Sequence, residues 1–352
     1  MEAIPRGLVS REMLRQMSGI KTIRTNVLPA NSSGNYQYTA TGNNKITFQI
    51  PSFPNSYINT KRSFIRFKLA TNDASAIIAG GAPVFRRMLL KNARGQVLED
   101  IDNYDVLCRL YQNMKTEAEL KGKANNTADY RALNDTKSYT TFGGYSTGRT
   151  VVHNLTSGLL GEFQEYLVPV SAMSAQSGYA FQLELFLNDN AKVLASKDAN
   201  AKTYTLTDVA YECELVEVSD AIMSDINSEL ASGAEVPLPF VSWRSHTTGL
   251  SGTGTSHQIN VSESAINLEA IYSVIVPQSW NQVVSVDTAT KFRNSENDYY
   301  KFHGGRATIS AANASANTTN YVKKYNWRYG STYYPSAPIE LENDSTLALE
   351  TT

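Results

Sequence analysis

The side chains that most often carry enzyme chemistry form no shared pattern in this sequence. The four histidines show no spacing such as H-x-x-x-H, which would let one helix face hold a metal ion. Glu212 and Glu214 flank Cys213 in an alternating run, and their carboxylates could be imagined as an acid and base pair. Glutamates that alternate in this way usually line a solvated face, so we interpret them as surface groups. The histidines are His153, His246, His257 and His303.

The remaining catalytic patterns are equally weak. The sequence has no Cys and His residues in a pattern typical of a nucleophile and its base. The Gly-rich stretch 249–254 does not predict a phosphate-binding loop, because it lacks a lysine and a following helix. Cys108 and Cys213 lie in separate apolar runs, and we expect both to be buried free thiols. The sequence therefore predicts a protein that is not an enzyme and has no catalytic, metal or cofactor site.

Aromatic side chains in the second half offer a different chemistry, since Trp and Tyr rings can stack on sugars. The same rings can fill a core or an interface, where aromatic residues dominate the contacts. Stacking would indicate a carbohydrate- or receptor-binding β-sandwich such as a lectin or a spike, whereas the other placement indicates a structural protein. The residues concerned are Trp243, Trp280, Trp327, Tyr333 and Tyr334.

The composition is typical of a folded protein built mainly from strands. The chain of 352 residues has a net charge of -1, with 41% hydrophobic and 18% charged residues, which excludes disorder throughout. The charge balance also argues against binding nucleic acid through clustered Lys and Arg. No run of about 18 apolar residues could span a membrane. Met1 is not followed by a charged start and an apolar core, so we expect folding in the cytosol.

One stretch, residues 84–111, predicts a strand, a glycine turn, a second strand and a short helix. Gly95 supplies the positive φ that a tight hairpin turn demands. Asp102 or Asn103 can cap the helix that follows. The apolar positions of this helix, at helical spacing, are Val106, Leu107, Leu110 and Tyr111.

Alternating apolar and polar residues predict most of the other elements. Strands are expected over 44–51, 62–69, 162–170, 179–187 and 204–218, the last bent near Asp208. Residues 21–35 read as an extended polar arm, 115–160 as a long loop, and 219–230 as a helix capped by Ser219. Turn and proline residues over 232–239 mark the best domain boundary. Strand patterns then resume over 240–244, 256–261, 270–276, 299–309 and 321–329.

Residues 8–20 predict a short amphipathic helix, with Ser10 as cap and Gly19 as stop. Its apolar face, formed by Met13, Leu14 and Met17, can dock on the helix's own domain. The alternative is that this face lies on a membrane or on a neighbouring subunit.

The two halves of the chain show the same faint order of elements. A basic pair inside a strand and a glycine turn occur at 86–87 and Gly95, and again at 323–324 and Gly330. With the linker, this order favours two similar β domains of sandwich or jelly-roll type. The predicted domains are the helix and arm (1–30), the first β domain (31–231), the linker (232–239) and the second (240–352). Few residues follow Gly330, so the second domain looks incomplete.

Three stretches carry a resemblance to a known family. They are SFPNSYINTKRSFIRFK at 52–68, FRR at 85–87 with GQVLEDIDNY at 95–104, and GSTYYPSAP at 330–338. On these, the chain resembles the double jelly-roll major capsid proteins of tailless icosahedral viruses, a lineage that includes membrane-containing phages, adenoviruses, virophages and polinton-like viruses.

The resemblance implies an all-β fold of two tandem eight-stranded jelly rolls, with a short N-terminal amphipathic helix and a few short helices. It also implies a homotrimer of pseudo-hexagonal outline that tiles an icosahedral shell in the virion, after assembly in the host cytoplasm or nucleus. The implied partners are further copies of the chain, penton and minor capsid proteins, and an internal membrane, without sequence-specific nucleic acid binding. The face of Met13, Leu14 and Met17 would point to the interior or membrane. Candidate loop or interface aromatics are Tyr130, Tyr139, Tyr145, Tyr333 and Tyr334.

Overall fold

The computed structural model describes twelve parts of the chain. They are residues 20–31, 37–72, 76–77, 84–114, 148–171, 173, 178–195, 203–233, 237–249, 256–263, 267–274 and 324–340. The predicted N-terminal helix with Met13, Leu14 and Met17 lies outside the described residues, as do Tyr130, Tyr139, Tyr145 and Trp280.

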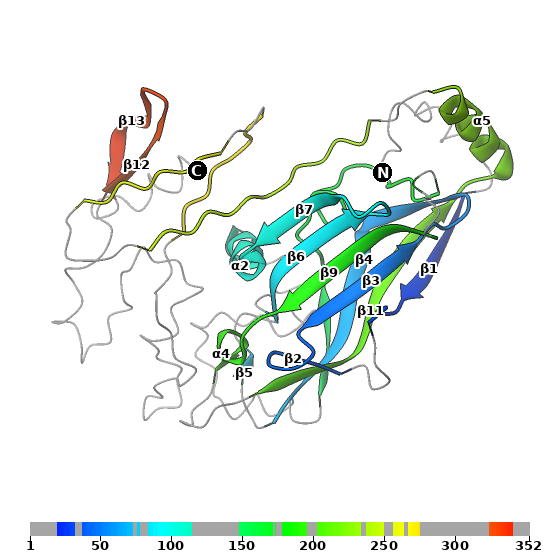
Figure 1. Cartoon of the computed structure of the whole chain (residues 1–352), viewed down its shortest axis with the longest axis horizontal. Helices are drawn as coiled ribbons and strands as arrows, with labels where there is room; N and C mark the ends of the chain where they lie inside the picture. Colours follow the sequence, from blue (N-terminus) through cyan, green and yellow to red (C-terminus); the bar gives the residue numbers. More distant parts are fainter. Residues whose placement is uncertain are drawn as a thin grey trace.

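Eight main strands between residues 21 and 217 form two antiparallel sheets (Figure 1). The first sheet has the order β1 (Lys21–Val27), β11 (Tyr204–Glu217), β4 (Ser56–Thr71) and β8 (Arg149–His153). The second has the order β3 (Lys45–Pro51), β9 (Tyr179–Leu187), β6 (Phe85–Asn92) and β7 (Val97–Asp102). Of the short strands, β2 (Tyr38–Thr39) pairs with one end of β11, whereas β5 (Ala76–Ile77) and β10 (Leu194–Ala195) pair with each other in a separate two-stranded sheet.

The pairing of these strands is that of a jelly roll. Counted along the chain, the first main strand pairs with the eighth, the second with the seventh, the third with the sixth, and the fourth with the fifth. Nested pairs of this kind wrap one antiparallel ribbon into two facing sheets. The prediction of an all-β fold with antiparallel sheets and few helices is confirmed, and residues 21–217 form one complete roll.

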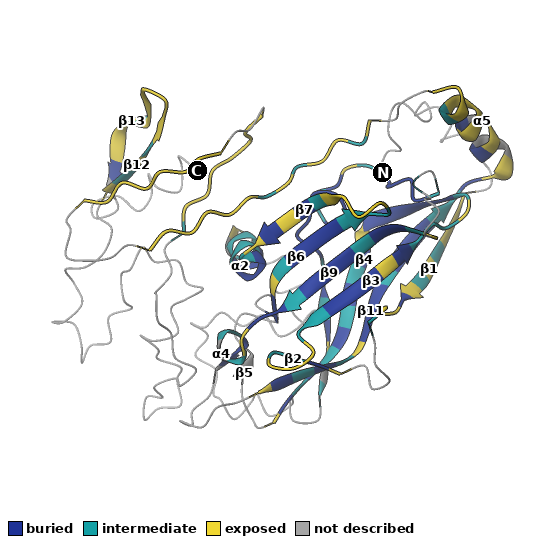
Figure 2. Cartoon of the chain, in the orientation of Figure 1, coloured by how far each residue is buried: buried dark blue, intermediate teal, exposed yellow. Residues whose placement is uncertain are grey.

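Inward-facing side chains of the two sheets make one common core. Figure 2 shows in dark blue the buried residues along the strands of both sheets. The ring centroids of Phe48 and Tyr211 lie 6.3 Å apart, and those of Phe67 and Phe85 lie 5.6 Å apart, each pair joining one sheet to the other. All four rings are fully buried. Burial of one such side chain stabilises a fold by about 1.5–3 kcal/mol, so these contacts hold the sheets together.

The predicted hairpin and helix at 84–111 are confirmed. Strands β6 and β7 pair around Gly95, which has a φ of 80°, and α2 (Tyr104–Met114) follows directly. The side of α2 that enters the core carries Tyr104 and Cys108, one helical turn apart. The predicted apolar positions of the helix are only half-buried.

Two strands of the first sheet escaped the sequence analysis. Strand β1 was expected to be a polar arm, because it is an edge strand whose alternate side chains face solvent. Strand β8 is short and lies within the expected loop 115–160. Residues 162–170, expected to be a strand, form turns with bridge residues at Tyr166 and Val168, of which Val168 pairs with Ile58. The bend near Asp208 is confirmed, since that residue has a φ of 50° where the β11–β4 register shifts.

After α5 (Asp220–Ala231), which begins behind Ser219 as predicted, the described chain is mainly extended. The strands expected over 240–244 and 256–261 and the described part (270–274) of the strand expected over 270–276 are wrong, because these residues join no sheet among the parts that the structure describes. The strand expected over 299–309 lies outside the described residues. Alternating apolar and polar residues predict which side chains share a face. A strand of a sheet also needs a neighbouring strand whose backbone forms hydrogen bonds with its own. The hairpin around Gly330 is confirmed as β12 (Lys324–Tyr329) and β13 (Thr332–Glu340). A further single turn, α4 (Asn190–Val193), precedes β10.

Candidate interaction surfaces

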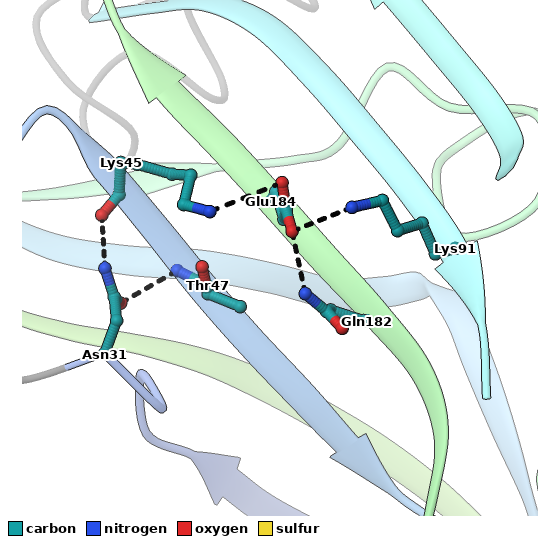
Figure 3. A network of polar contacts seen from close by, with 6 residues as sticks. All are labelled: Asn31, Lys45, Thr47, Lys91, Gln182 and Glu184. Atoms are coloured by element: carbon teal, nitrogen blue, oxygen red, sulfur yellow. Dashed lines mark hydrogen bonds and ion pairs between the residues drawn. The ribbon is translucent and has the colours of Figure 1, made fainter. Parts of the chain in front are cut away.

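The outer face of the second sheet centres on Glu184 of β9 (Figure 3). Its carboxylate lies 3.1 Å from Lys91 Nζ and 3.7 Å from Lys45 Nζ, one on each neighbouring strand. Gln182 Nε2 also donates a hydrogen bond to Glu184 Oε1 over 2.7 Å. The side chain of Asn31 binds the backbone of β3 nearby, because its amide donates a hydrogen bond to Lys45 O and accepts one from Thr47 N. The central charge of this face is therefore neutralised by cross-strand partners.

The outer face of the first sheet repeats this plan around Glu214 of β11. Asn59 Nδ2 donates to its carboxylate over 3.0 Å, and Arg24 and Arg62 approach it to 3.5 and 3.7 Å. The prediction that Glu212 and Glu214 line a solvated face is wrong for Glu214, which is 5% exposed. Strand β11 lies between β1 and β4, so long side chains from both neighbours cover its carboxylates.

A polar cluster lies inside the roll between α2 and the end of β8. The hydroxyl of Tyr104 accepts a hydrogen bond from Thr156 N over 2.8 Å and lies 3.0 Å from His153 Nε2. Cys108 Sγ donates to Thr156 Oγ1 over 3.4 Å. Burial raises the pKa of Cys108 to about 12, so its thiol stays protonated and is no nucleophile at neutral pH. Both cysteines are buried free thiols, as predicted.

Glu99 of β7 points into the interior and organises residues 155–163, which we name the Glu99 loop. Its carboxylate accepts hydrogen bonds from Gly158 N (2.9 Å), from Leu159 N (3.2 Å) and from the hydroxyl of Ser157. Burial raises the pKa of Glu99, against the opposing effect of these hydrogen bonds. A carboxylate held by donors on three consecutive residues fixes the path of the loop backbone.

One catalytic pattern was missed in the sequence. Residues 144–148, Gly-Tyr-Ser-Thr-Gly, fit the Gly-x-Ser-x-Gly pattern of a nucleophile elbow. Such an elbow places its serine between a strand and a following helix. Here strand β8 begins at Arg149, directly after Gly148, so the required helix is replaced by a strand. Residues 144–147 lie outside the described part of the chain.

Three of the predicted aromatic residues fall into two groups, one half-buried and one exposed. Trp243 is half-buried in a ring cluster with Tyr111, Phe163 and Tyr272, at centroid distances between 4.7 and 6.1 Å. Tyr333 and Tyr334 are 47% and 59% exposed on β13.

Trp327 of β12 belongs to neither group. Its side chain is half-buried, and its Nε1 donates to Ser273 Oγ over 3.1 Å. It therefore links the β12–β13 hairpin to the extended residues 267–274.

Two further properties concern the described residues alone. Within them, no group of three or more His, Cys, Asp and Glu side chains is placed to hold a metal ion. None of the helices found in those ranges combines the length and the apolar character needed to cross a membrane.

Comparison with known proteins gives structural similarity without sequence similarity. No protein-family model and no curated protein sequence matches the chain. Among solved structures, the Faustovirus major capsid protein matches with a TM-score of 0.37 and 9% identity, over 61% of this chain and 57% of that chain. A chain from the structure of the Sputnik virophage matches with a TM-score of 0.37 and 9% identity, over 57% of this chain and 48% of that chain. The chain thus spans about half the length of each of these two structures.

Proposed function

We propose that this chain is a structural protein of a viral capsid, in which the jelly roll of residues 21–217 is a rigid block that packs against further copies of itself. One observation supports this proposal above the others. Each outer sheet face holds a carboxylate that is already nearly buried and paired within the single chain, Glu184 on one face and Glu214 on the other.

Such faces are suited to close contact with another protein. Covering a charge is costly when it loses water without gaining a partner, whereas a charge that is already paired avoids most of that cost. The near-zero net charge of the chain also lets many copies approach without mutual repulsion.

The finer proposal follows the family resemblance. The chain would trimerise into pseudo-hexagonal capsomers that tile an icosahedral shell in the virion, without enzymatic activity. Residues 31–231 and 240–352 would be its two β domains, joined by the linker 232–239. Penton proteins, minor capsid proteins and an internal membrane are the further partners proposed, the last facing Met13, Leu14 and Met17.

Electron micrographs of the purified full-length chain test this function. We expect capsomers of pseudo-hexagonal outline, or closed shells. Gln49 is exposed on the outer face of β3, so Gln49→Glu adds an unpaired charge to that face. We expect the assembly constant to fall about tenfold, which corresponds to a free-energy cost of about 1.4 kcal/mol. Asn227→Glu, on the exposed side of α5, is the matched control and should leave assembly unchanged. Single particles without contacts between copies would contradict the proposal.

The alternative function is a carbohydrate- or receptor-binding module. The exposed pair Tyr333 and Tyr334 favours it, because exposed rings on a hairpin can stack on a sugar. The guanidinium of Arg328 already lies 5.6 Å from the ring centre of Tyr333, which reduces the free ring surface. Glycan-array binding that is lost in Tyr334→Ala would support this alternative, and an array without signal would exclude it for the glycans tested.

A further inference from the structure

The extended residues 237–249, which we name the strap, lie across the first jelly roll. In Figure 1 the strap is the yellow-green stretch that passes α2. It begins in the last residues of the linker and joins no strand among the described residues. Three separate contacts nevertheless hold it on the roll, and they involve the Glu99 loop, α2 and Asn103.

The first contact is a close approach of two backbones at Gly158. A Cβ atom added there would lie 1.6 Å from Val241 O and 2.6 Å from Val241 C. Real Cβ atoms never come so near, so only glycine lets the strap lie at this place. The backbone N–H of Gly158 donates a hydrogen bond to the Glu99 carboxylate, and this bond fixes the position of the backbone that the strap contacts.

The second contact is the aromatic anchor. The ring of Trp243 lies 5.3 Å from that of Tyr111 on α2 and 5.7 Å from that of Phe163 in the Glu99 loop. Such edge-to-face and tilted ring pairs add stabilisation beyond the area that they bury. Tyr272 joins the same cluster, and the neighbouring Ser273 accepts the hydrogen bond of Trp327. The anchor therefore connects the first roll to the strap and to residues 267–274, and the latter segment in turn binds Trp327 of β12.

The third contact is made by the amide of Asn103, just before α2. Its Nδ2 donates to Ser245 Oγ over 3.3 Å and to Thr247 Oγ1 over 3.1 Å. The residues of the strap that touch the roll are thus Val241, Trp243, Ser245 and Thr247, which alternate as the side chains of an extended chain do.

The opposite side of the strap contacts a different part of the chain. Arg244 and His246 lie 3.5 and 3.0 Å from the carboxylate of Glu263 in the extended segment 256–263. One side of the strap therefore binds the first roll, and the other side binds a segment beyond the linker.

We propose that α2, Asn103 and the Glu99 loop form a binding surface for an extended segment with a tryptophan anchor, and that residues 241–247 of the same chain occupy it. The occupied surface is the joint that holds the part beyond the linker on the first roll. Capsomers form only when this joint is closed. This last step rests on the proposed capsid function, whereas the binding surface does not.

Gly158→Ala tests the surface without removing any of its side chains. The three atoms nearest to the added methyl group all belong to the Val241 backbone, so the variant should displace the strap. Gly249→Ala is the matched control, because nothing lies within 4 Å of its added Cβ. Mass spectrometry after brief trypsin treatment of the full chain then measures cleavage after Arg244. Cleavage needs local opening, and we expect it to be about tenfold faster in Gly158→Ala than in wild type or control.

A second pair of variants covers the case in which Gly158→Ala does not fold. Trp243→Ala should accelerate the same cleavage, and Trp243→Phe, which keeps a ring in the cluster, should restore most of the protection. Asn103→Cys with Thr247→Cys should form a disulfide within one chain upon oxidation and block cleavage after Arg244. Equal cleavage rates in all variants would overturn the proposed surface, and a disulfide between two chains would overturn its occupation by the same chain.

Assembly of the same variants separates this inference from the proposed function. We expect Gly158→Ala to lose capsomers while Gly249→Ala keeps them. Faster cleavage with normal capsomers would overturn the role of the joint in assembly and leave the capsid function standing. A wild-type chain that never assembles would overturn the capsid function, while the cleavage rates would still decide on the binding surface.

Discussion

At the residue scale, buried acids organise this molecule. Glu99, Glu184 and Glu214 are each at most 5% exposed, and each is surrounded by hydrogen-bond donors or basic side chains. The sequence does not distinguish them from surface acids, because their partners come from strands or loops that are distant in sequence. Alternation correctly places Glu212 and Glu214 on one face opposite the buried Cys213, but it says nothing about the arginines that cover that face.

The pH dependence of stability should report the buried carboxyl group of Glu99. Burial raises its pKa above the ordinary value of 4.5, so the folded state binds the proton more tightly than the unfolded chain. The free energy of unfolding should therefore fall as the pH rises from 4.5 through the raised pKa. Glu99→Gln should remove this fall in urea denaturation across that window. If the free energy of unfolding changed with pH in the same way for wild type and Glu99→Gln, Glu99 would not be the group responsible. Glu229→Gln, at an exposed position of α5, is the control.

Removal of the Glu214 side chain should destabilise the roll. Glu214→Ala leaves the buried amide of Asn59 without its acceptor and brings Arg24 and Arg62 together without their shared anion. We expect a loss of about 1–3 kcal/mol in the free energy of unfolding, measured with urea. Glu229→Ala, on an exposed helix surface, should change it by less than about 0.5 kcal/mol. A Glu214→Ala variant as stable as wild type would show that the cluster is dispensable.

At the element scale, local patterns predict the strands that have one buried and one exposed face. Strand β9 was predicted with its bounds, because Leu183, Leu185 and Leu187 alternate with outward residues. Edge strand β1 was missed, since its pairing with β11 creates a buried position only at Val27. Residues 240–244 of the strap were predicted as a strand, but their partners are side chains and a loop instead of a sheet.

The turn of the β6–β7 hairpin should depend on the backbone conformation of Gly95. This residue has a φ of 80°, and nothing lies within 4 Å of an added Cβ atom. Gly95→Ala should therefore lower the free energy of unfolding by about 1 kcal/mol through backbone strain. Gly249→Ala, in an ordinary conformation and equally open, should have a smaller effect. Thermal unfolding followed by circular dichroism measures both, and identical melting temperatures would contradict the strained turn.

The contact between the two sheets should be the main source of stability. Phe67→Ala removes a fully buried ring that packs on Phe85 of the other sheet. We expect a loss of about 3–5 kcal/mol in chemical denaturation, because a cavity remains where the ring was. Val97→Ala, at an exposed position of β7, is the control and should cost less than about 0.5 kcal/mol. A small effect of Phe67→Ala would mean that the sheets pack less closely than described.

At the scale of the whole molecule, one complete jelly roll carries a strap that links it to the rest of the chain. The order of its strands, the paired charges on both outer faces and the anchored strap are the features on which the proposed capsid function rests. The family resemblance predicted a fold of this kind from short stretches, whereas the strap contacts depend on Gly158 and Asn103, whose roles only the folded chain reveals.

The mass of the purified full-length chain in solution tests the central claim most directly. Each chain has a mass of 38.8 kDa, and multi-angle light scattering measures the mass of the particle without reference to its shape. The account predicts particles of three chains, or larger assemblies built from them, across the whole range of protein concentrations. A particle of one chain at every concentration would contradict it.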